Sequence, residues 1–576
     1  SLVFVFVQVV LDLMIPDYMS RITTLIETPG SAIGDVWSAG GMMLLCAFGS
    51  LVSSVAVCFF ASRIAANFSK RLRKEMFYKV ESFTLEEINA FSTASLITRS
   101  TNDVSQVQMM VVMSLQVVVK APLMAVWAIM KIAGKAWQWS LATGIAVVLL
   151  VAILSIAIVR TFPRFKRIQW LQDSLNQSAR ENLTGIRVVR AYNAEAYQEK
   201  KFENVNTELL ENSLYANRTM TLLSPFMGLV MNCLNMSIYW IGAVLISSVA
   251  AGGATGIAAR VDIFADMIVF MSYAMQVIMS FIMIVMVIII APRALEAAKR
   301  ISEVLAAQPK VISGTVTDSG DISGTVEFKN VSFTYPGGSG NVLSNVSFKA
   351  DKGETVAFIG STGSGKTTLM NLIPRFYDAS EGEVRVGGVD VRKYDLKLLR
   401  DQVAVVLQKN VLFSGTIYEN LRWGNPGATD EECRAACRLA CADEFIERFP
   451  DKYNTWIEQG GSNVSGGQKQ RLTIARALLR KPKVLILDDS TSAVDTATDA
   501  KIRKAFREEI PGTTKIIIAQ RISSVQDADR ILVLDNGQIN GLGTHAELLA
   551  TNAIYQEVYN SQTQGGGDFD KQGGAQ

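Results

Sequence analysis

Long apolar runs dominate the first 300 residues, and after them the pattern changes. A helix needs about 20 apolar residues to cross the hydrocarbon core of a bilayer. Runs of that length predict six membrane spans, at residues 1–25, 37–66, 112–134, 138–162, 222–250 and 263–291. The first run begins at Ser1 without a basic leading region or a small-residue cleavage site, so we interpret it as a membrane helix with a trimmed start.

The segments that join these runs differ in length and charge. Three are short, at residues 26–36, 135–137 and 251–262, and the first of them has no Lys or Arg. The two long segments, 67–111 and 163–221, are basic and have a helical pattern. Because basic loops stay on the cytoplasmic side of a membrane, we expect the long segments and both chain ends in the cytoplasm. They should continue the membrane helices as cytoplasmic extensions.

Beyond residue 300, short β-branched strands alternate with glycine-rich turns and amphipathic helices, the pattern of an α/β domain. We therefore predict a membrane domain over residues 1–302, a polar linker over 303–325 and an α/β domain over 326–562. The tail, 563–576, is rich in Gly and Gln and is expected to be disordered.

Composition limits the chemistry. Hydrophobic residues make up 49% and charged residues 19%, with a mean hydropathy of +0.24, whereas soluble chains are nearer ~25% charged. The formal net charge of +3 gives no polyanion-binding character, so no nucleic-acid partner is expected. The single histidine, His545, excludes a histidine-rich metal site and a Ser-His-Asp triad. Cys433, Cys437 and Cys441 recur along one helix face without a CxxC pair, which favours buried packing over metal binding.

A short apolar strand, Val356–Ile359, leads into a glycine-rich loop and then an apolar helix. The loop reads GxxxxGK[ST], and in this strand–loop–helix context it predicts an ATP phosphate loop. Backbone N–H groups of such loops face phosphate oxygens. The predicted ATP-binding residues here are Gly360, Ser361, Gly363, Ser364, Gly365, Lys366, Thr367 and Thr368. Lys366 would bridge the β- and γ-phosphates, and Thr367 would bind Mg²⁺; a glycine-rich turn without a ligand is the alternative.

A second apolar strand, Val484–Leu487, ends in Asp488, where phosphoryl-transfer sites need a carboxylate for the metal. The sequence Val464-Ser-Gly-Gly-Gln468 lies between the two motifs. It resembles the signature of ATP-binding-cassette (ABC) ATPases, and the spans followed by this cassette resemble an ABC exporter half-transporter. The resemblance covers essentially the whole chain apart from its start and tail. It implies an α-helical membrane domain of six transmembrane helices with long cytoplasmic extensions, fused to an α/β P-loop cassette at a bacterial plasma membrane.

The resemblance also implies roles for further residues. Tyr335 is similar to the aromatic residue that stacks on adenine, with an ordinary strand tyrosine as the alternative. Gln408 matches the glutamine that touches Mg²⁺ and the attacking water, and Ser490–Asp495 matches a loop that crosses to a partner cassette. The signature residues that would contact ATP held by that partner are Ser465, Gly466, Gly467 and Gln468. The active unit is therefore expected to contain two cassettes face to face.

Two cytoplasmic segments, Leu96–Asp103 and Glu181–Asn193, look like the coupling regions of exporters. Each would press a short helix onto a cassette, the second onto the opposite subunit. An ordinary amphipathic loop is the alternative for each.

Three positions depart from the family pattern. Asp489 stands where active cassettes carry the glutamate that polarises the attacking water, and its shorter side chain should stop roughly an ångström outside hydrogen-bond reach. Gln520 replaces the usual histidine, and it can donate a hydrogen bond but cannot carry positive charge. Gln459 takes the place of the glutamate of the exporter glutamate loop.

These departures favour a division of labour like that of heterodimeric bacterial multidrug exporters. This chain would hold Mg²⁺ and ATP in a weakly hydrolysing site with Asp489, Gln520 and Gln408 as its catalytic residues. Its intact signature would complete the competent site of a second, non-identical half-transporter, and amphipathic compounds would be the substrates. The alternatives are a working homodimer, a lipid or peptide exporter, and a regulatory ATP-binding subunit. An importer is disfavoured, because importers generally carry the spans and the cassette on separate chains.

A few residues of the predicted spans are candidates for contact with substrate. Lys120 lies in the third span beside Pro122, and intramembrane charge is often functional, although a snorkelling or ion-paired lysine fits equally. Polar residues within the last two spans could line a cavity or bond between helices: Asn232, Asn235 and Gln276. The Met-rich run from Met279 to Met286 suits adaptable apolar contacts or core packing.

Overall fold

The computed structural model describes residues 2–27, 31–133, 136–249, 254–318, 322–490 and 494–564. The chain divides into two compact units. A helical unit comprises Ser1–Glu81 and Ala94–Ala306, and a cassette unit comprises Ser82–Thr93 and Ala307–Gln576. A short segment inside the predicted membrane domain therefore belongs with the cassette. The first two residues of the predicted disordered tail end helix α19 (Ala553–Gln564), and the remainder lies outside the described residues.

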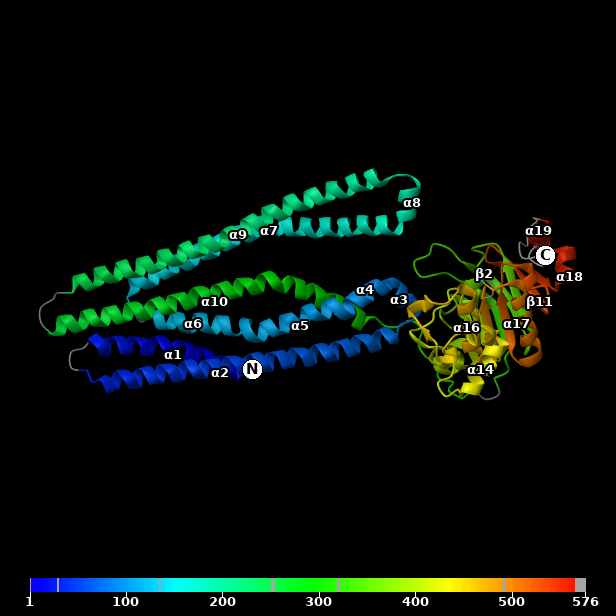
Figure 1. Cartoon of the computed structure of the whole chain (residues 1–576), viewed down its shortest axis with the longest axis horizontal. Coiled ribbons are helices and arrows are strands. Elements are labelled where there is room, and N and C mark those ends of the chain that lie inside the picture. Colours follow the sequence, from blue (N-terminus) through cyan, green and yellow to red (C-terminus); the bar gives the residue numbers. More distant parts are fainter. Residues whose placement is uncertain are drawn as a thin grey trace. The chain divides into compact units, whose positions relative to one another are not determined.

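The helical unit is built from long helices (Figure 1). Their bounds are α1 (Leu2–Glu27), α2 (Ile33–Glu81), α4 (Thr93–Thr98), α5 (Val104–Met113), α6 (Lys120–Ala133), α7 (Trp137–Thr184), α8 (Ile186–Ala191), α9 (Glu195–Ser248) and α10 (Ala254–Ala306). Within the described ranges, six helical stretches are long and apolar enough to cross a membrane, which confirms the six predicted spans. The extensions of α2, α7 and α9 beyond their apolar parts confirm the long helical segments.

The third span is a composite of α4, α5 and α6, joined by π-helical turns at Arg99–Asp103 and Ser114–Val118. The second turn precedes Pro122, which has no N–H to donate to the carbonyl four residues earlier. The loosened turn at Ser114–Val118 is consistent with this interruption. Helices α7 and α9 run side by side and connect through α8 (Figure 1).

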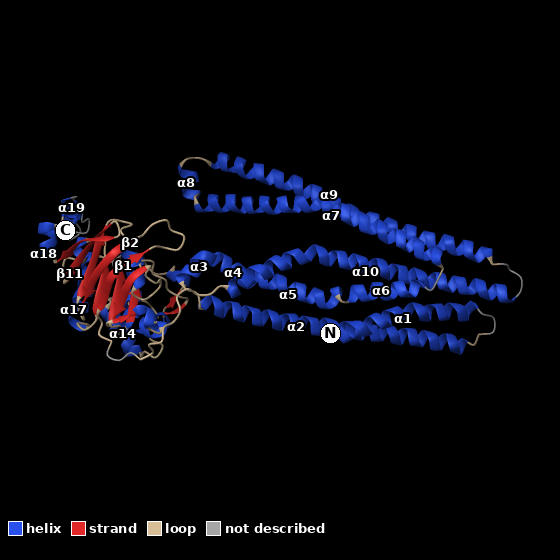
Figure 2. Cartoon of the chain, turned by 180° about the vertical axis from the view of Figure 1, so that it is seen from behind, coloured by secondary structure: helices blue, strands red, loops and turns tan. Residues whose placement is uncertain are grey.

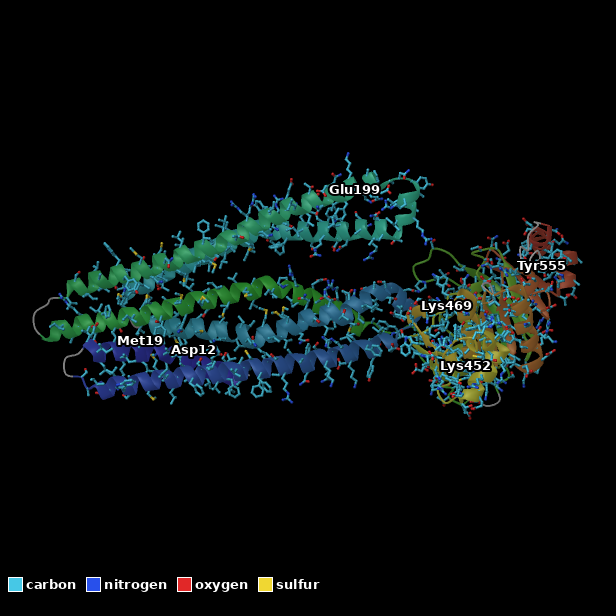
Figure 3. The ribbon with its side chains drawn as sticks, viewed as in Figure 1. Asp12, Met19, Glu199, Lys452, Lys469 and Tyr555 are labelled. Carbon is cyan, nitrogen blue, oxygen red and sulfur yellow. The ribbon has the colours of Figure 1, made fainter. Side chains whose placement is uncertain are left out.

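Charged side chains inside the apolar runs pair with one another. Asp12 of α1 (Figure 3) accepts a bond from Ser50 and lies 3.2 Å from the ammonium of Lys120. One turn further along α1, Asp17 lies 2.6 Å from Lys131 and accepts a 2.6 Å hydrogen bond from Tyr273. Pairing is the way proteins tolerate charge in a membrane. The structure therefore places Lys120 in an ion pair, the alternative to a substrate contact.

In the described residues, the cassette unit combines a six-stranded, a four-stranded and a two-stranded sheet with surrounding helices. Figure 2 distinguishes its strands from its helices by colour. The strands are β1 (Val326–Phe333), β2 (Leu343–Ala350), β3 (Thr355–Gly360), β4 (Glu381–Val386), β5 (Val389–Asp390), β6 (Val403–Val406), β7 (Gly415–Thr416), β8 (Trp456–Ile457), β9 (Val484–Asp488), β10 (Thr514–Ile518), β11 (Arg530–Asp535) and β12 (Gln538–Gly543). The helices are α3 (Leu85–Phe91), α11 (Lys366–Leu372), α12 (Leu396–Gln402), α13 (Ile417–Arg422), α14 (Asp430–Leu439), α15 (Asp443–Ile446), α16 (Gly466–Leu478), α17 (Thr496–Glu509), α18 (His545–Thr551) and α19.

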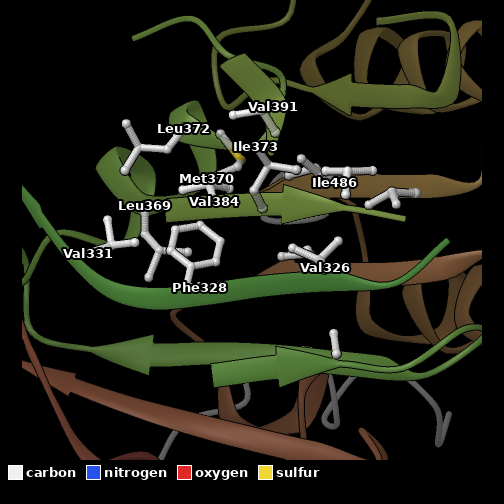
Figure 4. Close-up of a cluster of buried hydrophobic side chains, with 14 of the residues drawn as sticks. Val326, Phe328, Val331, Leu369, Met370, Leu372, Ile373, Val384, Val391 and Ile486 are labelled. Carbon is white, nitrogen blue, oxygen red and sulfur yellow. The ribbon is translucent and has the colours of Figure 1, made fainter. Parts of the chain in front are cut away.

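The main sheet has the order β12-β11-β3-β10-β9-β6 and is parallel from β11 to β6. A second, antiparallel sheet has the order β2-β1-β4-β5. A buried cluster fills the space around β1, β4 and α11, with Phe328 and Met370 among its members (Figure 4). On α14, Cys433 and Cys437 are buried in a second cluster with α16, which agrees with the packing role expected of them. Cys441 was wrongly placed on the same helix face: α14 ends at Leu439, and Cys441, with φ +52°, is only partly buried against the cluster. The predicted fold class is confirmed.

Candidate functional site

The predicted site residues lie at the ends of neighbouring strands, along one edge of the main sheet. Strand β3 runs directly into the phosphate loop, and its neighbour β10 is followed by Gln520. Strand β9 ends in Asp488, and β6 is followed by Gln408. Because these strands are parallel, their carboxyl ends meet, and this is where open α/β sheets bind ligands. Strand order thus gathers residues that lie up to 160 positions apart in the sequence.

The phosphate loop folds around the Lys366 side chain. Its ammonium donates to the carbonyl oxygens of Gly360 and Ser361, each at 2.8 Å, and lies 3.4 Å from the Ser364 hydroxyl. Burial lowers the pKa of Lys366, while Asp488 and Asp489 oppose that shift. Gly365 has φ +98°, and a Cβ there would meet the Leu343 side chain at 2.7 Å. The loop therefore depends on a glycine at this position.

Asp488 and Thr367 form the predicted metal pair. The Thr367 hydroxyl donates to Asp488 Oδ1 at 3.3 Å, and Asp488 is buried. Burial raises the pKa of Asp488, and the neighbouring Asp489 adds to this shift, while the Thr367 hydrogen bond and Lys366 oppose it.

The side-chain amides of Gln520 and Gln408 both donate to the Asp489 carboxylate. Gln520 Nε2 donates to Asp489 Oδ2 at 3.3 Å, and Gln408 Nε2 donates to the same oxygen at 3.5 Å. Both distances exceed the usual ~2.9 Å of such bonds. Burial raises the pKa of Asp489, opposed by the Gln408 hydrogen bond, Arg521 and Lys366. Its φ of +46° lies in the left-handed region, which Asp tolerates better than most residues.

The oxygen-rich donor set fits Mg²⁺ and a nucleotide. Mg²⁺ prefers oxygen ligands and is commonly held by one or two carboxylates together with waters and substrate phosphates. In the described part of the chain no group of three or more His, Cys, Asp or Glu gathers, so Thr367 and Asp488, with Gln408, would hold the ion in that way. The Ser490 hydroxyl, directly after Asp489, is buried without a hydrogen-bond partner among the described residues. A polar group left over at this edge is consistent with a polar ligand.

Tyr335 takes a different environment from the one expected. Its ring packs edge-on against Phe333 and Tyr377, at centroid distances of 4.9 and 5.3 Å. Its hydroxyl shares a 3.0 Å hydrogen bond with Thr368. The role of Tyr335 in stacking on adenine stays a prediction.

The signature residues are engaged in starting α16. The Ser465 hydroxyl accepts a hydrogen bond from the Gln468 N–H, and the Gln468 side chain accepts one from the Ser465 N–H at 2.9 Å. This reciprocal capping box leaves Gly466 and Gly467 in the first turn, where N–H groups lack helical partners. Their contact with a partner's ATP stays a prediction. In the crossing loop Ser490–Asp495, residues 491–493 lie outside the described residues, and Asp495 caps α17.

The role of Leu96–Asp103 as the first coupling region stays a prediction. The structure keeps Leu96–Asp103 in the helical unit, where Arg99 pairs with Glu303 and Asp103 with Arg300. The short helix that belongs to the cassette unit is α3, about ten residues earlier. Its capping box, Thr84 with Glu87, is visible in the sequence as T-x-x-E and could have located it. The second predicted region forms α8, whose neighbours Leu183 and Tyr192 are exposed.

The ion pairs between membrane helices were not predicted from the sequence. Asp12 and Asp17 lie in the first span, and Lys131 in the third. Opposite charges within separate apolar runs are the signal that could have paired them. Arg521, which opposes the raised pKa of Asp489, follows Gln520 directly and was not singled out.

Comparisons with known proteins agree with this architecture. A family model described as ABC transporter matches residues 343–492, and one described as ABC transporter transmembrane region matches residues 1–281. An "Uncharacterized ABC transporter ATP-binding protein" of Mycobacterium tuberculosis is 37% identical over 573 residues, covering 95% of this chain and 93% of the relative. The "ATP-dependent lipid A-core flippase" of Pseudomonas aeruginosa is 33% identical over 503 residues, covering 87% of this chain and 81% of the flippase.

The solved structure of a bacterial Atm1-family ABC exporter with ATP bound superposes with a TM-score of 0.79 and covers 97% of both chains, at 24% identity. It shows that the fold is that of an ABC exporter. A membrane-spanning helical unit fused to a P-loop ATPase cassette defines an ATP-driven membrane transporter. The chain belongs to the ABC transporters, in the half-transporter arrangement with transmembrane region and cassette in one polypeptide. It is a multi-pass membrane protein whose cassette lies in the cytoplasm.

Proposed function

We propose that this chain is one half of a heterodimeric exporter of the plasma membrane that moves amphipathic compounds outward. It would hold ATP in a weakly hydrolysing site and lend its Ser465–Gln468 signature to the competent site of a non-identical partner. The observation that carries this proposal is the environment of Asp489, a short carboxylate approached by two neutral amides.

The residues of the chain have distinct roles in this proposal. Lys366 and the loop N–H groups would hold the phosphates, and Thr367, Asp488 and Gln408 would hold Mg²⁺. Bound Mg²⁺ with ATP supplies the phosphoanhydride whose cleavage drives transport and neutralises charge on its phosphates. Asp489 and Gln520 would orient the attacking water only weakly. Weak orientation follows from the side-chain length of Asp489 and from the lack of positive charge on Gln520.

Co-purification of the native complex tests the proposal. A tag on this chain should bring down a second, different half-transporter at one-to-one stoichiometry from detergent-solubilised membranes. A complex in which Lys366→Ala replaces the phosphate-loop lysine should keep the partner, because pairing does not depend on catalysis. Recovery of two identical copies with brisk ATP hydrolysis would overturn the proposal.

A lipid substrate is the second candidate, favoured by the 33% identity to a protein named as a lipid A-core flippase. Reconstituted complex in vesicles distinguishes the two. A fluorescent phospholipid that crosses leaflets only with ATP would support lipid transport, whereas ATP-dependent movement of an amphipathic dye alone would support export of amphipathic compounds.

A further inference from the structure

Helix α19 is hydrogen-bonded to the loop that carries Gln520. Gln562 lies in the last turn of this helix and uses both polar atoms of its side-chain amide. Its Oε1 accepts a 2.8 Å hydrogen bond from the Ile522 N–H, and its Nε2 donates a 2.7 Å hydrogen bond to the Gln520 carbonyl. One side chain therefore binds the backbone on both sides of Arg521.

These two bonds restrict the backbone between them. Arg521 is extended, with φ −97° and ψ +129°. An amide that pairs with the carbonyl before an extended residue and with the N–H after it takes the place of one residue of a neighbouring parallel strand. Gln562 therefore holds the loop in a strand-like conformation, although strand β10 has already ended at Ile518.

The packing of α19 fixes where Gln562 lies. Tyr555 precedes it by seven residues, on the same face of the helix, and is buried (Figure 3). The Tyr555 hydroxyl shares a 2.7 Å hydrogen bond with His545 Nδ1, and its N–H donates to Asn552 Oδ1 at 2.9 Å. Ile522 belongs to the same buried cluster as Tyr555. Helix and loop are thus parts of one packed region of the cassette.

The side chain of Gln520 extends from this loop toward the reaction site. Its Nε2 donates to Asp489 Oδ2 at 3.3 Å. On the sheet side, the Ala519 N–H donates to the Phe358 carbonyl at 3.4 Å, a longer bond than the usual ~2.9 Å. The two bonds from Gln562 are shorter, so they are the closer attachment of the backbone from which the Gln520 side chain extends.

A second glutamine of α19 allows the loop contact to be separated from simple docking of the helix. Gln556 donates from Nε2 to the Leu549 carbonyl of α18 at 2.7 Å. This bond joins α19 to its neighbouring helix without touching the loop. Gln556 and Gln562 therefore share a residue type and a helix but differ in what they hold.

We propose that Gln562 is a positioning residue of the ATPase site, whose amide holds the backbone around Arg521 and thereby keeps the Gln520 side chain beside Asp489. The inference rests on the proposed weakly hydrolysing site. Gln562 bonds to backbone groups, so it would act on the reaction through Gln520.

Phosphate release from the full-length complex, with Mg²⁺ and ATP and with the partner's own site silenced, tests this proposal. Gln562→Met keeps the side-chain length and removes both bonds, so kcat should fall about three-fold or more. The KM for ATP should stay within about two-fold, because the phosphate loop is unchanged. Gln562 is exposed, and replacing an exposed side chain usually costs little stability, so the variant should fold.

Two further variants separate positioning from helix docking. Gln556→Met removes a bond of α19 but leaves both bonds of Gln562, so it should keep the wild-type kcat. Gln520→Ala removes the side chain that is positioned and should lower kcat at least as far as Gln562→Met. Adding Gln562→Met to Gln520→Ala should lower kcat no further, since residues that act through one another are not additive.

Three results would overturn the inference and leave the proposed function standing: an unchanged kcat in Gln562→Met, an equal fall in Gln556→Met, or a further fall when Gln562→Met is added to Gln520→Ala. Brisk hydrolysis by the wild-type site that still depends on Gln562 would overturn the proposed weak site alone. A wild-type site that hydrolyses no ATP would overturn the inference and favour a regulatory ATP-binding subunit.

Discussion

Replacing Asp489 by glutamate is the most direct test of the weak site. The added methylene extends the carboxylate by roughly 1.5 Å, which is one carbon–carbon bond. That extension is more than the ångström by which the aspartate is expected to fall short of the water. The hydrogen bonds that Gln520 and Gln408 donate to Asp489, at 3.3 and 3.5 Å, are longer than the usual ~2.9 Å.

The expected gain follows from two opposing effects. A well-placed general base contributes ~10²- to 10⁴-fold to the rate. The left-handed backbone of Asp489, with φ +46°, opposes this, because a residue other than Gly, Asn or Asp there costs about 1–2 kcal/mol. Asp489→Glu should therefore raise the kcat of this site by ~10- to 10³-fold. Adding Gln520→His should raise it further by supplying a donor that can carry charge.

Phosphate release from the purified complex measures this change, with the partner's own site silenced so that turnover comes from the Asp489 site. Asp489→Asn is the control, since it keeps the side-chain shape but cannot act as a base, and it should lower the residual rate while nucleotide still binds. A kcat that does not rise in either the single or the double variant would refute the geometric account of the weak site and would favour a regulatory subunit.

Three further outcomes are expected. Burial raises the pKa of Asp488 above its ordinary 3.8, so ionisation of this carboxyl group destabilises the fold as the pH rises through the raised pKa. At neutral pH, Asp488→Asn should therefore raise the Tm of the nucleotide-free protein and remove the stability that Mg²⁺ and ATP add. An unchanged Tm would contradict this expectation. Gly365→Ala should weaken ATP binding about ten-fold, because the added Cβ would meet the Leu343 side chain. The Gly363→Ala variant has open space around its Cβ and should bind ATP more tightly than the Gly365→Ala variant. Calorimetry measures both affinities, and equal values would contradict the steric argument. Lys131→Met leaves the Asp17 carboxylate without its paired ammonium group. This single variant should therefore have a lower Tm in detergent than the double variant Lys131→Met with Asp17→Asn. The reverse order would show that the ion pair does not stabilise the helices.

The site residues could be predicted from local sequence because each sits in a motif of fixed spacing. The phosphate loop and Asp488 each follow an apolar strand, and Gln520 and Gln408 follow two more. Adjacent parallel strands then bring them to one edge without further information. The shared bonding of Gln520 and Gln408 to one oxygen of Asp489 could not be predicted, because it depends on strand order and on the backbone conformation at Asp489.

The sequence by itself determined the membrane spans, the cassette and its nucleotide motifs, since apolar length and glycine spacing act locally along the chain. Only the tertiary structure decided which segment joins the cassette. The contacts that assign Ser82–Thr93 there join Glu87 to Lys310 and Asn89 to Tyr377, more than 200 residues apart in sequence. Such pairs are set by packing over long distances, and no local pattern of hydrophobic and polar residues encodes them.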